Sequence, residues 1–567
     1  MLNLTRHKLI RRLISKVGWQ ELTLFGLIAL VLLPSLFVSW MIVDDGVSIL
    51  NAQKISHFLS TFDFRGLFDS FIEKESGRFR PAYWFFYWFS YLLVGKSALG
   101  HHLIHLIVVG STVYLIFSII NRLISSKTSA LIASALFLLS SLNIENWYRL
   151  GPQEPLITLY LALSIYFLIK QIDIKNTKSA RRKLYFFLSV LPLVPAYFTK
   201  ETFIAFLPFS ALLLIGVFWV KEKSQKKIWK RQTLYFFAFN VLLAISSILV
   251  SMFIRTHGYY SAYYSVSILG LVGSAKGYVK AIFSSYGIFA WIFAFSYLAA
   301  IVRLIIRKSL DLQQFKQIAF LVGGLSFFII QLPWMFIMGR YLEPALLFFS
   351  IFFAFEIEKL LKIAKNISKV IIQLDIWDRE TKLSYPVTYL KFIAVVFLFL
   401  IFFYINIPSS LNYVADTILG NRNIAKTLNL AARTAAPNST VYMNLKKGDA
   451  TIELVFESGL HMNLFYDRPD LTVEYLDDGN LNQLKKGGVV VTAIASSQFF
   501  VFREEEIRKE NKIQTIGTIN HSVYNLLFLP FPYKPVIKFV VLQRPLTLQH
   551  FLRYSSSQNQ WKIYKVL

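Results

Sequence analysis

Two adjacent carboxylates, Asp44 and Asp45, stand directly after the first long apolar run of the chain. A carboxylate within hydrogen-bond reach of a hydroxyl group can act as a general base, which typically accelerates a reaction about 10²–10⁴-fold. Partial burial raises the pKa of a carboxyl group and brings it towards useful basicity. The alternative interpretation is that these acids cap the next helix or lie in interfacial water.

Ionisable side chains recur at the ends of several other apolar runs. Such groups are costly at membrane depth, so they tend to mark function. Arginine can hold phosphate oxygens through two parallel donors, so a mixture of acids and bases suits a site for a lipid phosphate and a polar acceptor. The residues concerned are Arg78, Arg80, His101, His102, His105, Glu145, Arg149, Glu154, Lys200, Glu201, Arg340, Tyr341 and Glu343.

Each of these groups also has a purely structural explanation. Arginines near a span can extend to lipid headgroups, and Lys200 and Glu201 can form an ordinary ion pair of neighbours. His101 and His105 share one helical face and could bind a metal ion, with interfacial hydrogen bonding as the alternative. The chain has no cysteine, which excludes a disulfide framework and a thiolate metal site.

The composition indicates which elements must position these groups. Of the 567 residues, 55% are hydrophobic and only 16% are charged, whereas a soluble domain has about 25% charged residues. Several nearly uncharged runs are long enough to cross a hydrocarbon core. The formal charge of +28 could indicate nucleic acid, but much of the Lys and Arg stands in short loops, where it sets membrane topology. We therefore expect a polytopic α-helical membrane protein with no nucleic-acid partner.

The basic N-terminus is expected to stay in the cytoplasm, so the first span delivers the acidic pair to the outer face. The first extracytoplasmic loop is expected at about 44–100, and a polar, Tyr-rich outer loop at 255–283. The apolar runs predict about 11 transmembrane helices, at about 20–43, 101–121, 128–145, 154–170, 183–199, 202–220, 233–254, 284–305, 317–338, 342–360 and 387–407.

An odd number of spans leaves residues 408–567 outside the membrane. Short β-type runs alternate there with charged stretches, which predicts a soluble extracytoplasmic α/β domain. The tail shows no catalytic triad, phosphate loop or zinc spacing, so we assign it no chemistry. The expected organisation is a transmembrane catalytic domain over 1–407 and this outer domain, in a multi-pass protein of the plasma membrane.

The order and spacing of the polar stretches resemble the GT-C superfamily of membrane glycosyltransferases, and within it the protein O-mannosyltransferase-like branch. The likeness begins with the acidic pair and covers roughly residues 20–360. It continues through "GRFRPAYWFFYWFSYLLVGKSALGHHLIHLI", "FLLSSLNIENWYRLGPQEPLITLYLAL", "FTKETFIAFLPFSALLL" and "GRYLEPALLF". Two features depart from the branch, because Asp45 stands where Glu is common and "SSLN" replaces a His-Pro-His stretch. These departures leave the fold intact and leave the sugar and the acceptor open.

The resemblance implies a GT-C-like fold and an inverting transfer of a hexosyl or pentosyl group. The donor is a polyprenyl-phosphate-linked sugar, and the acceptor is a hydroxyl of a glycan, lipid or protein at the outer face of the bilayer. Asp44 or Asp45 is then the base, and Glu154 is a second acid that orients the acceptor or holds a divalent cation such as Mg²⁺ or Mn²⁺. The candidates for binding the donor phosphate are Lys200 and Arg340, then Arg80, followed by Arg78, Arg149 and Arg255. The supporting residues are Glu201, Tyr341, His101, His102 and Glu145.

A membrane transporter or lipid flippase is the alternative function. Many transporters have two corresponding broken helices in paired halves, and this sequence shows no such internal symmetry. A non-catalytic assembly or sensor protein would explain an outer domain, but it would not explain acids and bases at the ends of successive spans.

Overall fold

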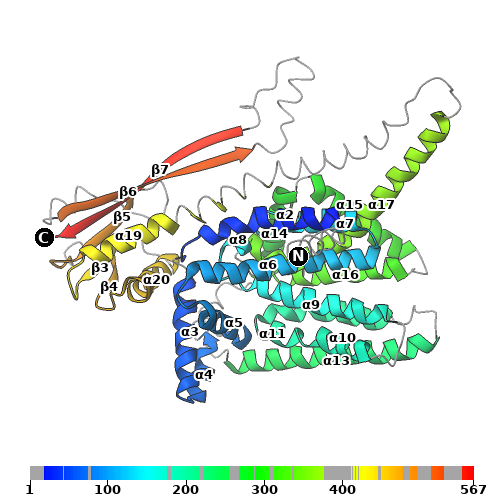
Figure 1. Cartoon of the computed structure of the whole chain (residues 1–567), viewed down its shortest axis with the longest axis horizontal. Helices are drawn as coiled ribbons and strands as arrows, with labels where there is room; N and C mark the ends of the chain where they lie inside the picture. Colours follow the sequence, from blue (N-terminus) through cyan, green and yellow to red (C-terminus); the bar gives the residue numbers. More distant parts are fainter. Residues whose placement is uncertain are drawn as a thin grey trace, which may run out of the picture.

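The structure is a computed structural model in which most of the chain is described (Figure 1). The described residues are 18–41, 44–73, 78–174, 180–216, 223–254, 267–286, 288–306, 312–334, 337–375, 406, 410, 413–414, 417–418, 421–444, 449–476, 484–494, 513–528 and 552–567. Arg255 and nearly all of the predicted last span at about 387–407 lie outside these ranges.

Most of the described chain up to Asp375 is helical, because an apolar segment in a membrane must satisfy its backbone hydrogen bonds internally. A short hairpin, β1 (Ile72–Glu73) and β2 (Arg78–Phe79), interrupts the helices, as do three 3-10 helices, η1 (Leu33–Phe37), η2 (Glu201–Phe206) and η5 (Gly339–Leu342). The α-helices are α2 (Trp19–Leu32), α3 (Asp45–Ser60), α4 (Phe64–Ser70), α5 (Pro81–Val94), α6 (Ala98–Ile124), α7 (Lys127–Leu138), α8 (Ile144–Tyr148), α9 (Glu154–Asp173), α10 (Ala180–Val190), α11 (Leu193–Tyr197), α12 (Leu207–Gly216), α13 (Lys223–Ile254), α14 (Ile268–Tyr286), α15 (Ile288–Ile306), α16 (Leu312–Ile329) and α17 (Glu343–Asp375).

Three stretches of described helix are long and apolar enough to cross a membrane, namely Trp19–Phe37, Ala98–Ile124 and Lys230–Ile254. Two further apolar helices, Lys127–Leu138 and Glu201–Gly216, are shorter. The structure therefore agrees with a mostly helical membrane protein that crosses the bilayer more than once. The predicted number of about 11 spans and the orientation of the two termini stay predictions.

Some expected spans are interrupted. The span predicted at about 183–199 is divided between α10 and α11, where Pro192 lacks the N–H group that a continuous helix needs. The span predicted at about 128–145 ends early, because α7 stops at Leu138 and α8 begins only at Ile144. The prediction of an outer loop at 255–283 is wrong from Ile268 onwards, because α14 begins there. The small polar residues of that stretch concealed a helix whose buried residues are Ser274, Tyr278, Ser285 and Tyr286.

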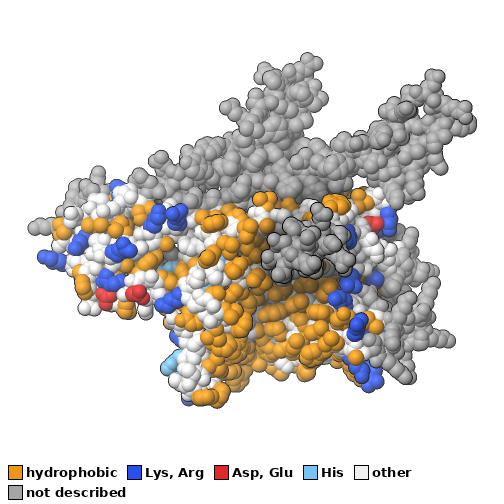
Figure 2. Space-filling view, viewed as in Figure 1, with side chains coloured by type: hydrophobic (Ala, Val, Ile, Leu, Met, Phe, Trp, Pro, Cys, Tyr) orange, Lys and Arg blue, Asp and Glu red, His pale blue; other side chains and the backbone are white. Residues whose placement is uncertain are grey.

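The surface of the helical part is strongly apolar. Figure 2 shows hydrophobic side chains across the middle of the molecule, with lysine and arginine side chains gathered beyond them. The exposed side chains include Leu30, Phe253 and Leu269, which are 72%, 83% and 86% exposed. Apolar surface of this extent is rare on soluble monomers and marks a membrane or protein contact.

Close packing between α16 and α17 holds the helical part together. The ring of Phe348 is fully buried and lies 5.1 Å from that of Phe209 and 5.8 Å from that of Phe327, measured between ring centroids. Gly323 allows this contact, because a Cβ atom at that position would lie 2.5 Å from the Phe348 ring. The absence of a side chain at Gly323 therefore sets the distance between the two helices.

The described residues of 421–567, called here the C-terminal module, form a mixed sheet with two helices. The strand order is β4 (Thr472–Leu476), β3 (Thr440–Asn444), β5 (Val489–Ile494), β7 (Leu552–Val566) and β6 (Ile513–Phe528). Strand β3 is parallel to β4 and β5, whereas β7 is antiparallel to β5 and β6. The helices are α19 (Asn421–Thr434) and α20 (Asp449–Tyr466). In Figure 1 the module lies at one end of the helical part, with α20 beside the start of α3.

Alternation along the strands explains how the sheet forms. Val441 and Met443 of β3 pack into a cluster with the buried residues of α19 and α20, whereas Tyr442 faces a second cluster that contains Tyr564 of β7. Successive side chains of a strand point to opposite faces, so β3 is buried on both of its faces.

Replacing Gly323 by alanine tests the packing of α16 on α17. Overpacking a buried contact typically costs about 1–3 kcal/mol, so we expect the G323A variant to unfold at a lower temperature in detergent. Gly26 of α2 is the matched control, because a Cβ atom there meets nothing within 4 Å. Equal melting temperatures for G323A and G26A would contradict the packing argument.

Candidate active site

Asp44 and Asp45 occupy different environments despite being neighbours. Asp44 is the N-cap of α3, with a left-handed backbone at φ 76° and ψ −32°, and its side chain is 38% exposed. Asp45 is only 1% exposed, and its Oδ2 accepts a hydrogen bond from the Met41 N–H at 2.8 Å. Burial raises the pKa of Asp45 to about 7. Of the two acids, Asp44 is therefore the one whose carboxylate a ligand can reach.

A chain of ion pairs connects Asp44 to distant parts of the sequence. A terminal nitrogen of Arg149 lies 2.8 Å from Asp44 Oδ2, and the other lies 2.6 Å from Glu145 Oε1. Arg340 also donates to Glu145 Oε1, at 2.6 Å. These contacts join the start of α3, helix α8 and η5, which places four of the predicted residues in one continuous network.

The loop between α8 and α9 lies directly against Asp44. A Cβ atom on Gly151 would lie 2.5 Å from the Asp44 Cβ and 2.7 Å from its Oδ2. Two tyrosines of α5 hold this loop, since Tyr83 donates to the Gly151 carbonyl at 2.7 Å and Tyr87 donates to the Leu150 carbonyl. The loop therefore supplies a backbone wall against which the Asp44 side chain is fixed.

Glu154 and Lys200 form a buried ion pair beside this network. Helix α9 begins at Glu154, where a negative charge interacts favourably with the helix dipole. The Lys200 Nζ donates to Glu154 Oε1, and the two side chains are 9% and 4% exposed. Tyr341 contacts two cations, because Lys200 Nζ and Arg340 Cζ lie 4.6 and 5.3 Å from its ring centroid. Glu154, Lys200, Arg340 and Tyr341, all predicted from the sequence, therefore lie close together. Lys200 pairs with Glu154 and not with its neighbour Glu201.

The two predicted arginines of the hairpin each pair with an acid. Arg80 donates to Glu73 Oε1 at 2.9 Å, and Arg78 lies 3.4 Å from Glu201 Oε1. The Arg78 guanidinium also lies over the Trp334 ring, 5.7 Å from its centroid. Glu201 therefore supports Arg78 from η2 rather than its neighbour Lys200.

Most of these elements line one open cavity of about 740 Å³. Asp45, His101, His102, Glu145 and Arg149 do not line it, although Glu145 and Arg149 pair with residues that do. The predicted residues that line it are Asp44, Arg78, Arg80, Glu154, Lys200, Glu201, Arg340 and Tyr341.

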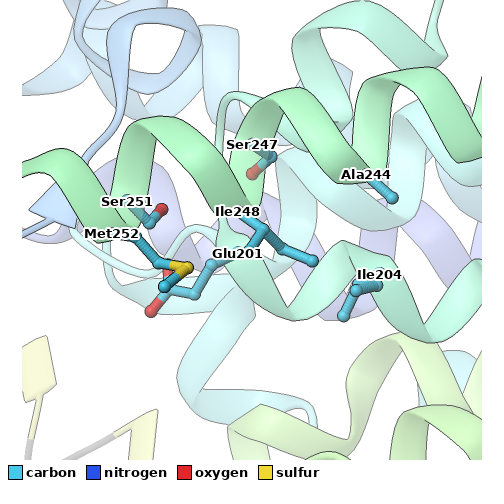
Figure 3. A pocket seen from close by; sticks show the side chains of 7 residues that line it. All are labelled: Glu201, Ile204, Ala244, Ser247, Ile248, Ser251 and Met252. Atoms are coloured by element: carbon cyan, nitrogen blue, oxygen red, sulfur yellow. The ribbon is translucent and has the colours of Figure 1, made fainter.

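A smaller hollow of about 130 Å³ adjoins Glu201 on the side of α13 (Figure 3). Ser247, Ile248, Ser251 and Met252 of α13 line it together with Glu201. Glu201 is thus shared between the two hollows, with α13 forming the wall beyond it.

Two histidines of α6, His101 and His105, contact backbone carbonyl groups of different segments. His101 Nε2 lies 3.0 Å from the Gly95 carbonyl oxygen, and His105 Nε2 lies 2.6 Å from that of Asn146. Among the described residues, no group of three His, Cys, Asp or Glu side chains could hold a metal ion. Arginine or lysine side chains pair with Asp44, Glu73, Glu154 and Glu201 of the cavity. The divalent cation expected from the sequence stays a prediction, and no step below depends on one.

Sequence reasoning missed several residues that line the cavity, among them Lys54, Glu73, Phe456 and Glu457. Lys54 had a detectable signal, because it follows Val47 and Asn51 at helical spacing along α3. No sequence signal pointed to Glu457, since it lies 413 positions from Asp44 in a region to which we assigned no chemistry.

Comparison with known proteins agrees with part of this description. Residues 80–250 match the family model described as dolichyl-phosphate-mannose-protein mannosyltransferase. The match confirms, over this segment, the resemblance to the protein O-mannosyltransferase-like branch. The segment includes Arg80, Glu154 and Lys200, whereas Asp44 and Arg340 lie outside it. No curated protein matches the chain significantly.

Similar solved structures include ArnT from Cupriavidus metallidurans bound to undecaprenyl phosphate, with 12% identity, a TM-score of 0.46, and coverage of 88% of this chain and 96% of that one. The apo state of the same protein gives 13% identity, a TM-score of 0.46, and coverage of 89% and 96%. A third similar structure is the archaeal oligosaccharyltransferase AglB from Archaeoglobus fulgidus, in complex with an inhibitory peptide and a dolichol-phosphate. It has 10% identity and a TM-score of 0.45, and the match covers 74% of this chain and 59% of that one.

The buried pair of Glu154 and Lys200 predicts an asymmetric effect of mutation. Removing one partner of a buried ion pair costs about 3–5 kcal/mol, whereas replacing both by apolar residues is often neutral. We expect K200A to lower the melting temperature in detergent strongly and E154L/K200M to recover most of the loss. Lys127, which is 41% exposed and pairs with Glu21, is the control, because an exposed pair contributes about 0–1 kcal/mol. A K200A variant as stable as K127A would contradict the burial of this pair.

The pKa of Asp45 predicts a dependence of stability on pH. An aspartate titrates near 3.9 in an unfolded chain, and burial raises the pKa of Asp45 to about 7 in the folded protein. The folded state then binds this proton more tightly, so the stabilisation is complete below about pH 4 and is lost as the pH rises through about 7. Thermal unfolding at several pH values should show the parent losing stability relative to D45N between about pH 4 and 7. A difference that stays constant with pH would refute the raised pKa.

Proposed function

We propose that this chain is an integral membrane glycosyltransferase of GT-C type. It moves a sugar from a polyprenyl-phosphate donor to an acceptor hydroxyl at the outer face of the membrane, with inversion at the anomeric carbon. The observation that carries the proposal is that the accessible carboxylate of Asp44 shares one cavity with Arg78, Arg80, Lys200 and Arg340. The family match over residues 80–250 supports the same class of activity.

Asp44 is the proposed base, because it lines the cavity and Asp45 does not. Its Oδ2 is engaged by Arg149 at 2.8 Å, which fixes the direction of the carboxylate. Asp44 takes the proton of the acceptor hydroxyl while the acceptor oxygen bonds to the anomeric carbon. The bond between that carbon and the phosphate oxygen breaks at the same time, and the electron pair leaves with the polyprenyl phosphate.

The cations of the cavity stabilise the charge that develops on the departing phosphate. A phosphate leaves readily as an anion, so positive charge at its oxygens matters more than protonation. Lys200 and Arg340 both contact the ring of Tyr341, and Arg80 and Arg78 line the same cavity from the hairpin. Glu154 holds Lys200 in place through their ion pair, and Tyr341 presents an aromatic face near the same cations.

The size of the cavity suits this reaction. Sites for small ligands typically occupy about 300–1,000 Å³, and the cavity of about 740 Å³ falls within this range. A sugar phosphate and the hydroxyl end of an acceptor are substrates of that scale. Glycans, lipids and proteins all present such hydroxyl groups, so each is a candidate acceptor class.

The proposal is tested with purified protein and a panel of polyprenyl-phosphate-linked hexoses and pentoses, measuring release of polyprenyl phosphate. We expect the parent to turn over at least one donor and D44N to lose about 10²–10⁴-fold, because a general base typically contributes this much. The control is D467N, which makes the same replacement at an exposed aspartate with a left-handed backbone, φ 52°. Parental turnover by D44N would refute the assignment of the base.

The same panel separates transfer from transport. In liposomes, a flippase would move the labelled lipid-linked sugar between leaflets and would leave the bond between sugar and phosphate intact. Movement of this kind without any release of polyprenyl phosphate would establish the transporter alternative and overturn the proposed transferase.

A further inference from the structure

One face of α20 packs on the segment that leads into Asp44. His461 Nε2 lies 3.0 Å from the Met41 carbonyl oxygen, and the Phe465 ring stacks on that of Trp40 with 5.2 Å between the centroids. Lys96 Nζ donates to the Leu464 carbonyl at 2.8 Å, near the C-terminal end of the helix, where a cation is favourable. The C-terminal module is therefore attached to the membrane part at the position of the proposed base.

Glu457 on the same helix bonds directly to the backbone of Asp44. The Asp44 N–H donates a hydrogen bond to Glu457 Oε1 at 3.1 Å. Gly46 lets the helix approach, because a Cβ atom there would lie 2.7 Å from Glu457 Oε2. Glu457 itself is 2% exposed, so its carboxylate is held in place by the surrounding structure.

This hydrogen bond from the Asp44 N–H to Glu457 involves a residue, Asp44, whose backbone conformation is unfavourable. A non-glycine residue with positive φ is uncommon, and such strain persists only where neighbouring contacts enforce it. Asp44 adopts φ 76°, and its N–H is directed to Glu457. The conformation also decides where the Asp44 carboxylate points, since φ and ψ set the direction of the Cα–Cβ bond.

The module also contributes surface to the cavity. Phe456 and Glu457 both line it, together with Asp44 and the phosphate-binding candidates. Phe456 is 57% exposed, an unusual exposure for a large apolar side chain beside a polar cavity. The wall nearest to Asp44 is thus built partly by a region of the chain that the sequence placed in a separate domain.

We infer that Glu457 is a positioning residue for the transfer reaction, through which the C-terminal module holds Asp44 in the left-handed conformation that directs its carboxylate into the cavity. This inference rests on the proposed function of the same site. Glu457 acts through the backbone of Asp44 and does not itself take the proton.

Two substitutions at Glu457 test the inference with the transfer assay. E457A removes the acceptor, and a displacement of about 1 Å at a reacting group can cost about 10²-fold, so we expect kcat to fall about 10–100-fold with the donor KM changed less than about threefold. E457Q keeps a carbonyl oxygen that can accept from the Asp44 N–H and should restore kcat to within about fivefold of the parent. G46A, which crowds Glu457 Oε2, should lower kcat in the same way as E457A.

The matched control is E474A, which removes an exposed glutamate from β4 of the same module and should leave kcat unchanged. Parental kcat in E457A would overturn the inference and would leave the proposed function standing, because D44N tests that independently. A loss of kcat in E457A that E457Q does not restore would also overturn it, since the role would then not be that of an acceptor.

A second measurement does not depend on activity. Hydrogen exchange of peptides covering residues 41–48 should be faster in E457A than in the parent, because the Asp44 N–H loses its acceptor. E474A should exchange at the parental rate in these peptides. Unchanged exchange in E457A would refute the contact itself, whether or not the chain proves to be a transferase.

Discussion

The cost of removing charge from water governs the arrangement of this site. A buried ion without a counter-ion is strongly unfavourable, and ion pairs in and beside the cavity join acids and bases of the hairpin and of α3, α8, α9, η2 and η5. Asp44, Glu145 and Glu154 each accept from Arg or Lys of another element or turn. The pairings fix how these elements approach one another, because moving any of them would leave a charge uncompensated. Apolar packing between the helices is much less specific about register, so the ion pairs define the geometry.

The same pairing gives the cavity its chemical character. Arg78, Arg80, Lys200 and Arg340 line the cavity, and each of them pairs with a carboxylate. A phosphate group entering the cavity meets preorganised positive charge, and an ordered site of this kind needs little rearrangement during a reaction. Two tyrosines of α5 complete the arrangement by fixing the loop at Gly151, which lies against the Asp44 side chain. Rigid backbone on one side and ion pairs on the other leave Asp44 few alternative positions.

Much of the site could be predicted from the sequence, because ionisable residues at the ends of apolar runs are rare and conspicuous. Asp44, Glu154, Lys200 and Arg340 were identified in this way, and the structure places all four around one cavity. Their partners were harder to predict. The neighbours Lys200 and Glu201 suggested a local pair, but successive residues point in different directions, and each pairs with a residue on another element.

The fold was predictable where apolar runs were long and uninterrupted, as for α6 and α9. The fold was harder to predict where proline divides an apolar run, as between α10 and α11, or where a helix contains many small polar residues, as in α14. Contacts over long sequence separations left no local pattern. Glu457 is the clearest case, because nothing in its own stretch indicates a role, and its importance follows only from the packing of α20 on α3.

The contact between Asp44 and Glu457 also has a consequence for biogenesis. The two residues are separated by 413 positions, and ribosomes add about 5–20 residues per second, so synthesis of the intervening chain takes roughly 20–80 s. Throughout that interval the turn at Asp44 has no acceptor from α20. A nascent chain would therefore lack a complete site until α20 has been synthesised and has folded against the start of α3.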